Sequence, residues 1–183
     1  MQSADTGANK EAVRAAVLAA RRQRGGGEIA AQRAQLRALV LARCVREGWR
    51  CVAAYEPMRT EPGSVELLAG WHGLGISVLI PTLLPDNDLD WAHWHPDPDR
   101  PRPALGPAAI ASAEAVFVPA LAVARDGVRL GRGGGSYDRA LARVGDVPVV
   151  ALLFDGELVD GLPHDQWDRS VSAVAAPSGW TDL

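Results

Sequence analysis

The sequence predicts an α/β protein with a mostly parallel sheet that is covered by helices on both faces. Segments with apolar residues at helical spacing alternate along the chain with short, fully apolar segments. Apolar runs bounded by glycine, proline or polar residues are typical of parallel strands buried on both faces. The chain has 183 residues, 48% of them hydrophobic, which is enough for one full-sized core. We therefore expect a single domain over residues 1–183.

Four helices are predicted from the spacing of apolar residues and from the residue types at their ends. Asn9, Ser64 and Ser136 are expected to cap the first, third and fourth, because their side chains can accept a hydrogen bond from a free amide of the first turn. Residues 1–8 are polar and are expected to be disordered. The expected helices are 10–24, 28–47, 65–73 and 137–144.

Seven strands are predicted from short apolar segments between turn residues. A stretch rich in proline and aspartate, 96–107, is expected to be an irregular excursion, and Asp126-Gly127 is expected to form a turn. The expected strands are 51–55, 76–81, 89–95, 115–119, 121–124, 147–154 and 171–175.

Charge and composition limit the kinds of molecule that the protein is expected to bind. The formal net charge of −3 gives no general attraction to nucleic acid or to anionic membranes. No apolar run approaches the ~20 residues of a membrane span, and the first residues lack the apolar stretch of a signal peptide. The two cysteines are too few for a disulfide framework. We expect a soluble cytoplasmic protein without nucleic acid or a membrane as partner.

The stretch from Arg129 to Asp138, Arg-Leu-Gly-Arg-Gly-Gly-Gly-Ser-Tyr-Asp, carries the strongest chemical signal and lies between a predicted strand and a predicted helix. Glycines let backbone amides approach a phosphate closely, and the start of a helix adds unpaired N–H groups. Arg129 and Arg132 add positive charge for phosphate oxygens, and Asp138 could bind a magnesium ion that bridges phosphates. The pattern predicts a phosphate-binding turn.

Two familiar phosphate-binding patterns do not fit this stretch. A Walker loop ends in Gly-Lys-Ser/Thr, and there is no lysine here; a dinucleotide fingerprint requires glycine at the position of Ser136. The structural alternative is a flexible glycine-rich hairpin, or a tight turn that packs a helix on a strand.

The segment Val-Pro-Ala-Leu-Ala-Val at 118–123, followed by Gly-Val-Arg-Leu-Gly-Arg-Gly-Gly-Gly-Ser-Tyr-Asp-Arg at 127–139, resembles the signature of the 5-formyltetrahydrofolate cyclo-ligase family. Shorter parts agree in the same order. Lys10 and Arg14 match a Lys-x-x-x-Arg near the start, and Glu61 and Asp168 match later acidic positions. The resemblance spans nearly the whole chain and implies a three-layer α/β/α Rossmann-like fold.

The resemblance also implies an activity. Members of the family convert 5-formyltetrahydrofolate and ATP, with Mg²⁺, into 5,10-methenyltetrahydrofolate, ADP and phosphate. The formyl oxygen attacks the γ-phosphate, N10 of the folate closes the ring, and phosphate leaves. A monomer or weak homodimer that acts on a small-molecule substrate is the expected form.

Site residues follow from the matched positions and, for the stacking contacts of Tyr55 and Trp91 or Trp94, from their aromatic side chains. Arg129, Arg132 and Asp138 are expected to be catalytic, and Asp138 and Asp168 to hold Mg²⁺. Tyr55, Glu61, Tyr137 and Trp91, with Trp94 as the alternative to Trp91, are expected to contact folate. The residues expected to bind ATP are Lys10, Arg14, Arg129, Gly131, Arg132, Gly133, Gly134, Gly135, Ser136, Tyr137 and Asp138.

Three departures from the family pattern keep other functions open. Ser136 and Trp167 stand where the family commonly has tyrosine and histidine, and no Gly-x-x-Glu-Pro segment is recognisable between His95 and Pro107. The first alternative is a non-catalytic paralogue that binds nucleotide or reduced folate. The second is another Rossmann-like enzyme that acts on a phosphorylated substrate.

Overall fold

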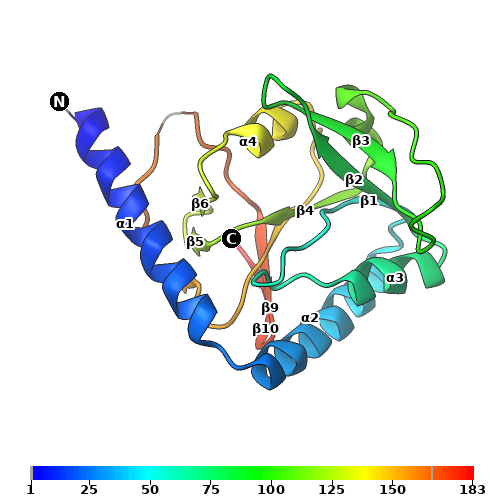
Figure 1. Cartoon of the computed structure of the whole chain (residues 1–183), viewed down its shortest axis with the longest axis horizontal. Coiled ribbons are helices and arrows are strands. Elements are labelled where there is room, and N and C mark those ends of the chain that lie inside the picture. The colour runs from blue at the N-terminus through cyan, green and yellow to red at the C-terminus, as the bar shows by residue number, and fades with distance from the viewer. Residues whose placement is uncertain (1, 166) are drawn as a thin grey trace.

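A seven-stranded mixed sheet is the central layer of the computed structural model, which describes residues 2–165 and 167–183 (Figure 1). The strand order is β10-β9-β7-β4-β1-β2-β3. The five inner strands are parallel, and the edge strands β3 and β10 are antiparallel to their neighbours. The strands are β1 Cys51–Ala53, β2 Ser77–Leu83, β3 Leu89–His93, β4 Ala115–Pro119, β7 Val149–Leu152, β9 Ala173–Ala176 and β10 Gly179–Asp182.

Successive side chains of the inner strands enter two separate apolar clusters, as the two-residue period of a strand requires. In β4, Ala115 and Phe117 belong to one cluster, and Val116 and Val118 belong to the other. Both faces are therefore buried, which explains why these strands are apolar throughout.

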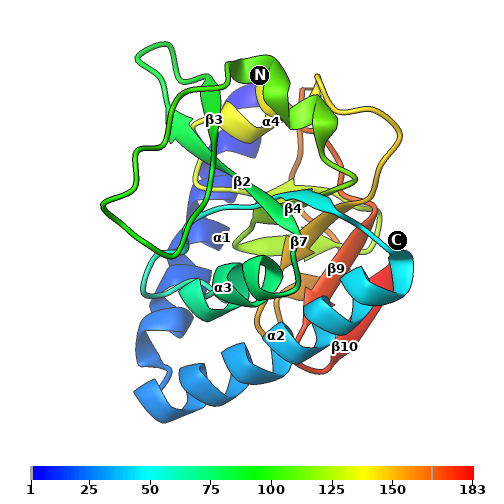
Figure 2. The same cartoon turned by 90° about the vertical axis from the view of Figure 1, so that its right-hand side faces the viewer.

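Helices cover both faces of the large sheet. On one face lie α2 (Gly26–Glu47) and α3 (Val65–Gly73), whose Leu36, Val40, Leu68 and Trp71 join the first cluster (Figure 2). The other face is covered by the 3₁₀ helix η1 (Pro107–Ser112) and by α4 (Ser136–Leu141). The predicted α/β architecture is confirmed. None of the described helices is long and apolar enough to cross a membrane.

A second, three-stranded sheet has the order β6-β5-β8 and lies between the large sheet and helix α1 (Gln2–Gln23) (Figure 1). Its strands are β5 Ala122–Ala124, β6 Arg129–Leu130 and β8 Leu158–Val159. Gly127 makes the turn between β5 and β6 with φ 88°.

Two predictions about helix starts are wrong. Helix α1 begins at Gln2 rather than after Asn9, so the described residues 2–8 are helical and not disordered, while Met1 lies outside the described residues. Residues 2–8 contain no proline to stop the helix. Ser136 is the first residue of α4, whose N-cap is Gly135 in the left-handed region without a side-chain cap. The predicted cap at Ser64 is confirmed, since its hydroxyl accepts a hydrogen bond from the Leu67 amide.

The order of the strands places a crevice at the carboxyl ends of β1 and β4. After β1 the chain crosses through α3 to β2 on one side, and it later returns to β4 on the other side of β1. The segments that leave β1 and β4 therefore diverge. In open parallel sheets this switch point is where ligands bind.

Candidate functional site

A cavity of about 770 Å³ opens at this switch point. Tyr55 follows β1 and Ala120 follows β4, and both line the cavity together with the N-terminal half of α1 and the glycine-rich turn. All but one of the site residues expected from the sequence line it: Lys10, Arg14, Tyr55, Glu61, Arg129, Gly131, Arg132, Gly133, Gly134, Gly135, Ser136, Tyr137, Asp138 and Asp168.

The glycine-rich turn at 131–135 uses glycine for conformation and for space. Gly133 and Gly135 have φ values of 102° and 67°, which favour glycine. A Cβ atom at Gly131 would lie 2.7 Å from Nη1 of Arg129. The turn therefore brings its backbone close to the buried arginine beside it.

Arg129 links the turn to the helix that follows. Its Nη2 donates to Oδ1 of Asp138 at 3.0 Å, and its Nη1 donates to the Pro119 carbonyl at 3.3 Å. Its guanidinium also lies 5.9 Å from the centre of the Tyr137 ring. The Arg169 amide donates to the same Asp138 oxygen at 3.1 Å. The arginine is held by contacts on several sides and is buried at the base of the turn.

Lys10 extends from α1 into the cavity and binds two aspartates that also line it. Its Nζ donates to Asp165 at 2.8 Å and to Asp168 at 2.6 Å. Burial disfavours the ammonium, but the hydrogen bonds and charges of the two carboxylates outweigh this effect and raise the pKa of Lys10. Burial would likewise raise the pKa of Asp168, but the bonds from Lys10 and from the Asp165 amide lower it. The lysine is therefore a stable cation at neutral pH.

Arg14 connects α1 to the glycine-rich turn. Its Nε donates to the Gly131 carbonyl at 2.9 Å, and its guanidinium lies beside Gly133. Lys10 and Arg14 are one helical turn apart and face the same cavity. Four cations from three segments, Lys10, Arg14, Arg129 and Arg132, thus converge on one space.

Glu61 and two tyrosines line the side of the cavity near β1. Oε1 of Glu61 accepts from Nε and Nη2 of Arg132, each at 3.3 Å, and Oε2 accepts from the Met58 amide at 2.8 Å. The hydroxyls of Tyr55 and Tyr137 are buried and have no partner among the described residues. Burial raises the pKa of both phenols well above the ordinary value. They remain neutral and can donate hydrogen bonds to a ligand.

Trp91 is the one expected site residue that the structure places elsewhere. It is 1% exposed and packs in the second apolar cluster, on the same face of β3 as Leu89 but two residues further along the strand. Trp94 is buried in the first cluster. Leu83 and Leu89 line the cavity near this position instead. Tyr55 and Tyr137 are the described aromatic residues on the cavity wall.

Asp165 also belongs to the site and was missed by sequence reasoning. It binds Lys10 jointly with Asp168, and its amide donates to Oδ2 of Asp168 at 2.8 Å. The Asp-x-x-Asp spacing was a signal, but the lysine partner lies 155 residues earlier in the chain.

No group of three or more metal-ligating side chains occurs among residues 2–165 and 167–183. Asp138 and Asp168 do line the same cavity. Oδ2 of Asp138 and Oδ1 of Asp168 accept no hydrogen bond within the described chain. Carboxylate oxygens suit Mg²⁺, which needs only one or two when phosphates and waters complete its shell. The residues present therefore fit this ion.

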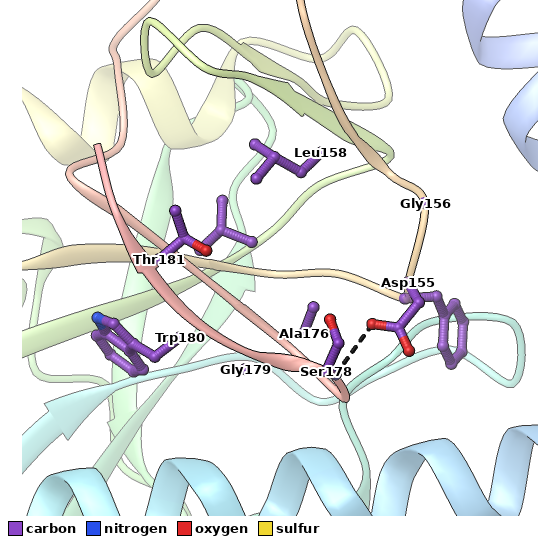
Figure 3. A pocket seen from close by; sticks show the side chains of 10 residues that line it. Asp155, Gly156, Leu158, Ala176, Ser178, Gly179, Trp180 and Thr181 are labelled. Carbon is purple, nitrogen blue, oxygen red and sulfur yellow. Dashed lines mark hydrogen bonds between the residues drawn. The ribbon is translucent and has the colours of Figure 1, made fainter.

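A second cavity, of about 200 Å³, lies between the segment after β7 and the β9–β10 hairpin (Figure 3). Asp155 closes one end by accepting a hydrogen bond from the Ser178 amide at 3.0 Å. Its described lining contains no lysine, arginine or histidine. It has none of the charge that would attract an anionic ligand.

The fold and the site define a class, the Rossmann-like α/β proteins with a cationic ligand cavity at the switch point of the sheet. Comparison with known proteins then gives the family. The profile of the 5-formyltetrahydrofolate cyclo-ligase family matches residues 6–177. The chain belongs to this family and is an enzyme of this type.

Individual relatives support the same family and fold. A 5-formyltetrahydrofolate cyclo-ligase of Mycolicibacterium smegmatis is 37% identical over 143 residues, which cover 70% of this chain and 74% of the relative. The structure is similar to the 5,10-methenyltetrahydrofolate synthetase of Mycoplasma pneumoniae, with a TM-score of 0.79, 20% identity, and coverage of 92% of this chain and 99% of the other. The synthetase of Aquifex aeolicus has a TM-score of 0.74 and 22% identity, covering 95% and 92%. Both structural similarities support the fold.

Proposed function

We propose that this chain converts 5-formyltetrahydrofolate and ATP into 5,10-methenyltetrahydrofolate, ADP and phosphate. The observation that carries the proposal is the convergence of four cations and a glycine-rich turn on one cavity at the switch point. Such an arrangement suits a triphosphate, because the phosphates can be bound by backbone amides and arginine forks together. The family membership supplies the reaction type.

In the proposed reaction the formyl oxygen attacks the γ-phosphorus, and the bond from that phosphorus to the β,γ-bridging oxygen breaks as ADP leaves. N10 then attacks the formyl carbon. The phosphate departs with the former formyl oxygen, and the N10 proton is released to solvent. Phosphoryl transfer of this kind asks the protein mainly for positioning and charge stabilisation.

Each cation has a place in that task. Arg129 is fixed by Asp138 and Pro119, so it can face a developing charge without reorganising. Lys10 and Arg14 approach from α1. Mg²⁺, held by Asp138 and Asp168, would neutralise charge on the phosphates. Positive charge is thus supplied both by α1 and by the glycine-rich turn.

The folate would occupy the side formed by Tyr55, Glu61 and Tyr137. Glu61 is paired with Arg132 through one oxygen, so a pterin whose amino edge binds Glu61 would compete with Arg132 and favour its transfer to a phosphate. The Arg132 side chain is 43% exposed and has room to do so. Met58, Leu83 and Leu89 provide apolar wall for the rings. This exchange would couple the two substrates.

The test is the rise of methenyltetrahydrofolate absorbance when purified protein meets 5-formyltetrahydrofolate and MgATP. The rise should require ATP and magnesium and should be lost in Asp138→Ala. Asp160→Ala is the matched control, because Asp160 is an exposed carboxylate outside the cavity, and its partner among the described residues is the surface Arg125. A folded wild-type protein that gives no rise would contradict the proposal.

The absent Gly-x-x-Glu-Pro segment favours one alternative, a paralogue that binds nucleotide or reduced folate without turnover. Residues 96–106 contain no helix or strand in the structure, and they match no expected folate contact. Equilibrium binding of ATP and folate without product formation would identify this alternative.

A further inference from the structure

Helix α1 is attached to the rest of the protein mainly by charged side chains. Within 9–23, the only buried side chains are Lys10 and Arg21. The apolar residues Val13, Val17 and Leu18 are only half-buried. Hydrophobic burial along this helix is therefore incomplete, and the two side chains buried most deeply are both charged.

Arg21 makes the most buried of these contacts and is 1% exposed. Its Nε donates to Oε1 of Glu157 at 2.8 Å, and its Nη2 donates to Oε2 at 2.7 Å. The same Nη2 donates to the Ala120 carbonyl at 2.7 Å. This is a two-pronged arginine–carboxylate pair, the ion-pair geometry that best fixes direction.

The partner of Arg21 is itself held rigidly. Oε2 of Glu157 accepts from the Phe154 amide at 2.9 Å, and the Glu157 carbonyl accepts from the Val123 amide at 3.1 Å. Ala120 lines the ligand cavity directly after β4. The pair therefore joins α1 to the end of the large sheet and to the small sheet.

Arg21 also shares one face of α1 with the two cations of the cavity. Lys10, Arg14 and Arg21 are separated by four and seven residues, which places them within about 40° of each other around the helix axis. Arg21 lies about 16 Å along the axis from Lys10. Fixing Arg21 therefore fixes the rotation of α1 about its axis, and with it the direction in which Lys10 and Arg14 point.

We propose that Arg21 and Glu157 are a positioning pair, which holds α1 so that Lys10 and Arg14 meet the phosphates of the nucleotide. This inference rests on the proposed function. The pair touches no substrate and acts through the helix. Without it, the C-terminal part of α1 would be followed directly by the flexible Gly25–Gly26 connection to α2, and the direction of the helix would depend mainly on the part-buried contacts of Lys10 and Arg14.

The variant that tests the pair is Arg21→Met with Glu157→Met. It removes both charges, so that no uncompensated charge stays buried, and it keeps apolar bulk. A second variant, Arg21→Lys, keeps the charge but cannot reproduce the fork. The control is Arg125→Met with Asp160→Met, which removes an exposed ion pair.

Three quantities are measured on the full chain: ATP affinity by calorimetry, the KM values for both substrates, and amide exchange along α1. The double variant should bind ATP about tenfold or more weakly, the loss expected when charge-assisted bonds are no longer aimed. At saturating ATP the KM for 5-formyltetrahydrofolate should stay near the wild-type value, and α1 alone should exchange faster. Arg21→Lys should fall between the wild-type and double-variant values.

Two results would overturn the pair as a positioning device. One is unchanged ATP affinity and α1 exchange in the double variant; the other is an equal rise in both KM values with faster exchange throughout the sheet. A wild-type protein that binds no ATP would overturn the proposed function, and this inference with it.

Discussion

Gly131 shows how closely single residues of the site are fitted to each other. The space that its missing side chain leaves is taken by Arg129, whose Nη1 would lie 2.7 Å from a Cβ atom there. The end of an arginine side chain can usually move aside. Here it is held by Asp138 and Pro119, so relief of the clash breaks a contact in the site.

Gly131→Ala should therefore weaken ATP binding more than it weakens the fold. We expect the free energy of unfolding to fall by about 1 to 2 kcal/mol from local overpacking. Chemical denaturation and the KM for ATP measure the two effects. Gly145→Ala is the control, because a Cβ atom there meets nothing within 4 Å. A Gly131→Ala enzyme with wild-type KM for ATP would show that Arg129 can shift without consequence.

At the scale of elements, α3 and α4 begin in different ways although each has a serine at its start. Ser64 lies before α3 in extended conformation, and its hydroxyl accepts from the Leu67 amide. Ser136 lies inside α4, and the preceding residue, Gly135, takes the left-handed conformation. The first turn of α4 thus lacks a side-chain cap and can offer amides to a ligand.

Ser64→Ala should lower the free energy of unfolding by about 1 kcal/mol, the usual cost of losing a serine cap. Ser136→Ala should leave it nearly unchanged, because no cap bond is lost. Urea denaturation of both variants measures the difference. Equal destabilisation by the two substitutions would mean that the hydroxyl of Ser64 contributes no more than that of Ser136.

The inner strands could be predicted because burial on both faces leaves an unbroken apolar run, as at 115–119. Strands β6 and β8 could not, because each has two residues and exists through its pairing with β5. The polar β10 likewise depends on pairing with β9. Local sequence carries periodicity and caps, whereas these short strands are defined by neighbours distant in the chain.

At the scale of the molecule, the site collects segments that only the topology brings together. The glycine-rich turn is local and could be found from sequence alone. The pairs Lys10–Asp168 and Arg132–Glu61 join residues 158 and 71 positions apart, so no spacing rule reveals them. Trp91 was misplaced for a related reason: it shares its face of β3 with the cavity-lining Leu89, but it pairs with Pro81 and is covered by residues distant in the chain.

Ligand binding in the cavity at the carboxyl ends of β1 and β4 should stabilise the folded protein. ATP at 100 times its dissociation constant should add about 2.7 kcal/mol to the free energy of unfolding, since it binds the native state only. Thermal unfolding and amide exchange measure the effect, and protection should concentrate in α1 and the turn at 131–135. Protection from amide exchange around Asp155 and Ser178 would instead indicate that the nucleotide binds in the smaller cavity.

Lys10 gives the molecule a property of practical use. All the other side chains among the 19 lysines and arginines are guanidinium groups, so an acylating reagent finds a single ε-amino target. That nitrogen is hydrogen-bonded to Asp165 and Asp168 inside the ligand cavity. Acylation at this atom should therefore be slow while α1 keeps this position, and faster in a variant in which the helix is released. The enzyme carries its own covalent reporter of the helix position, without any engineered label.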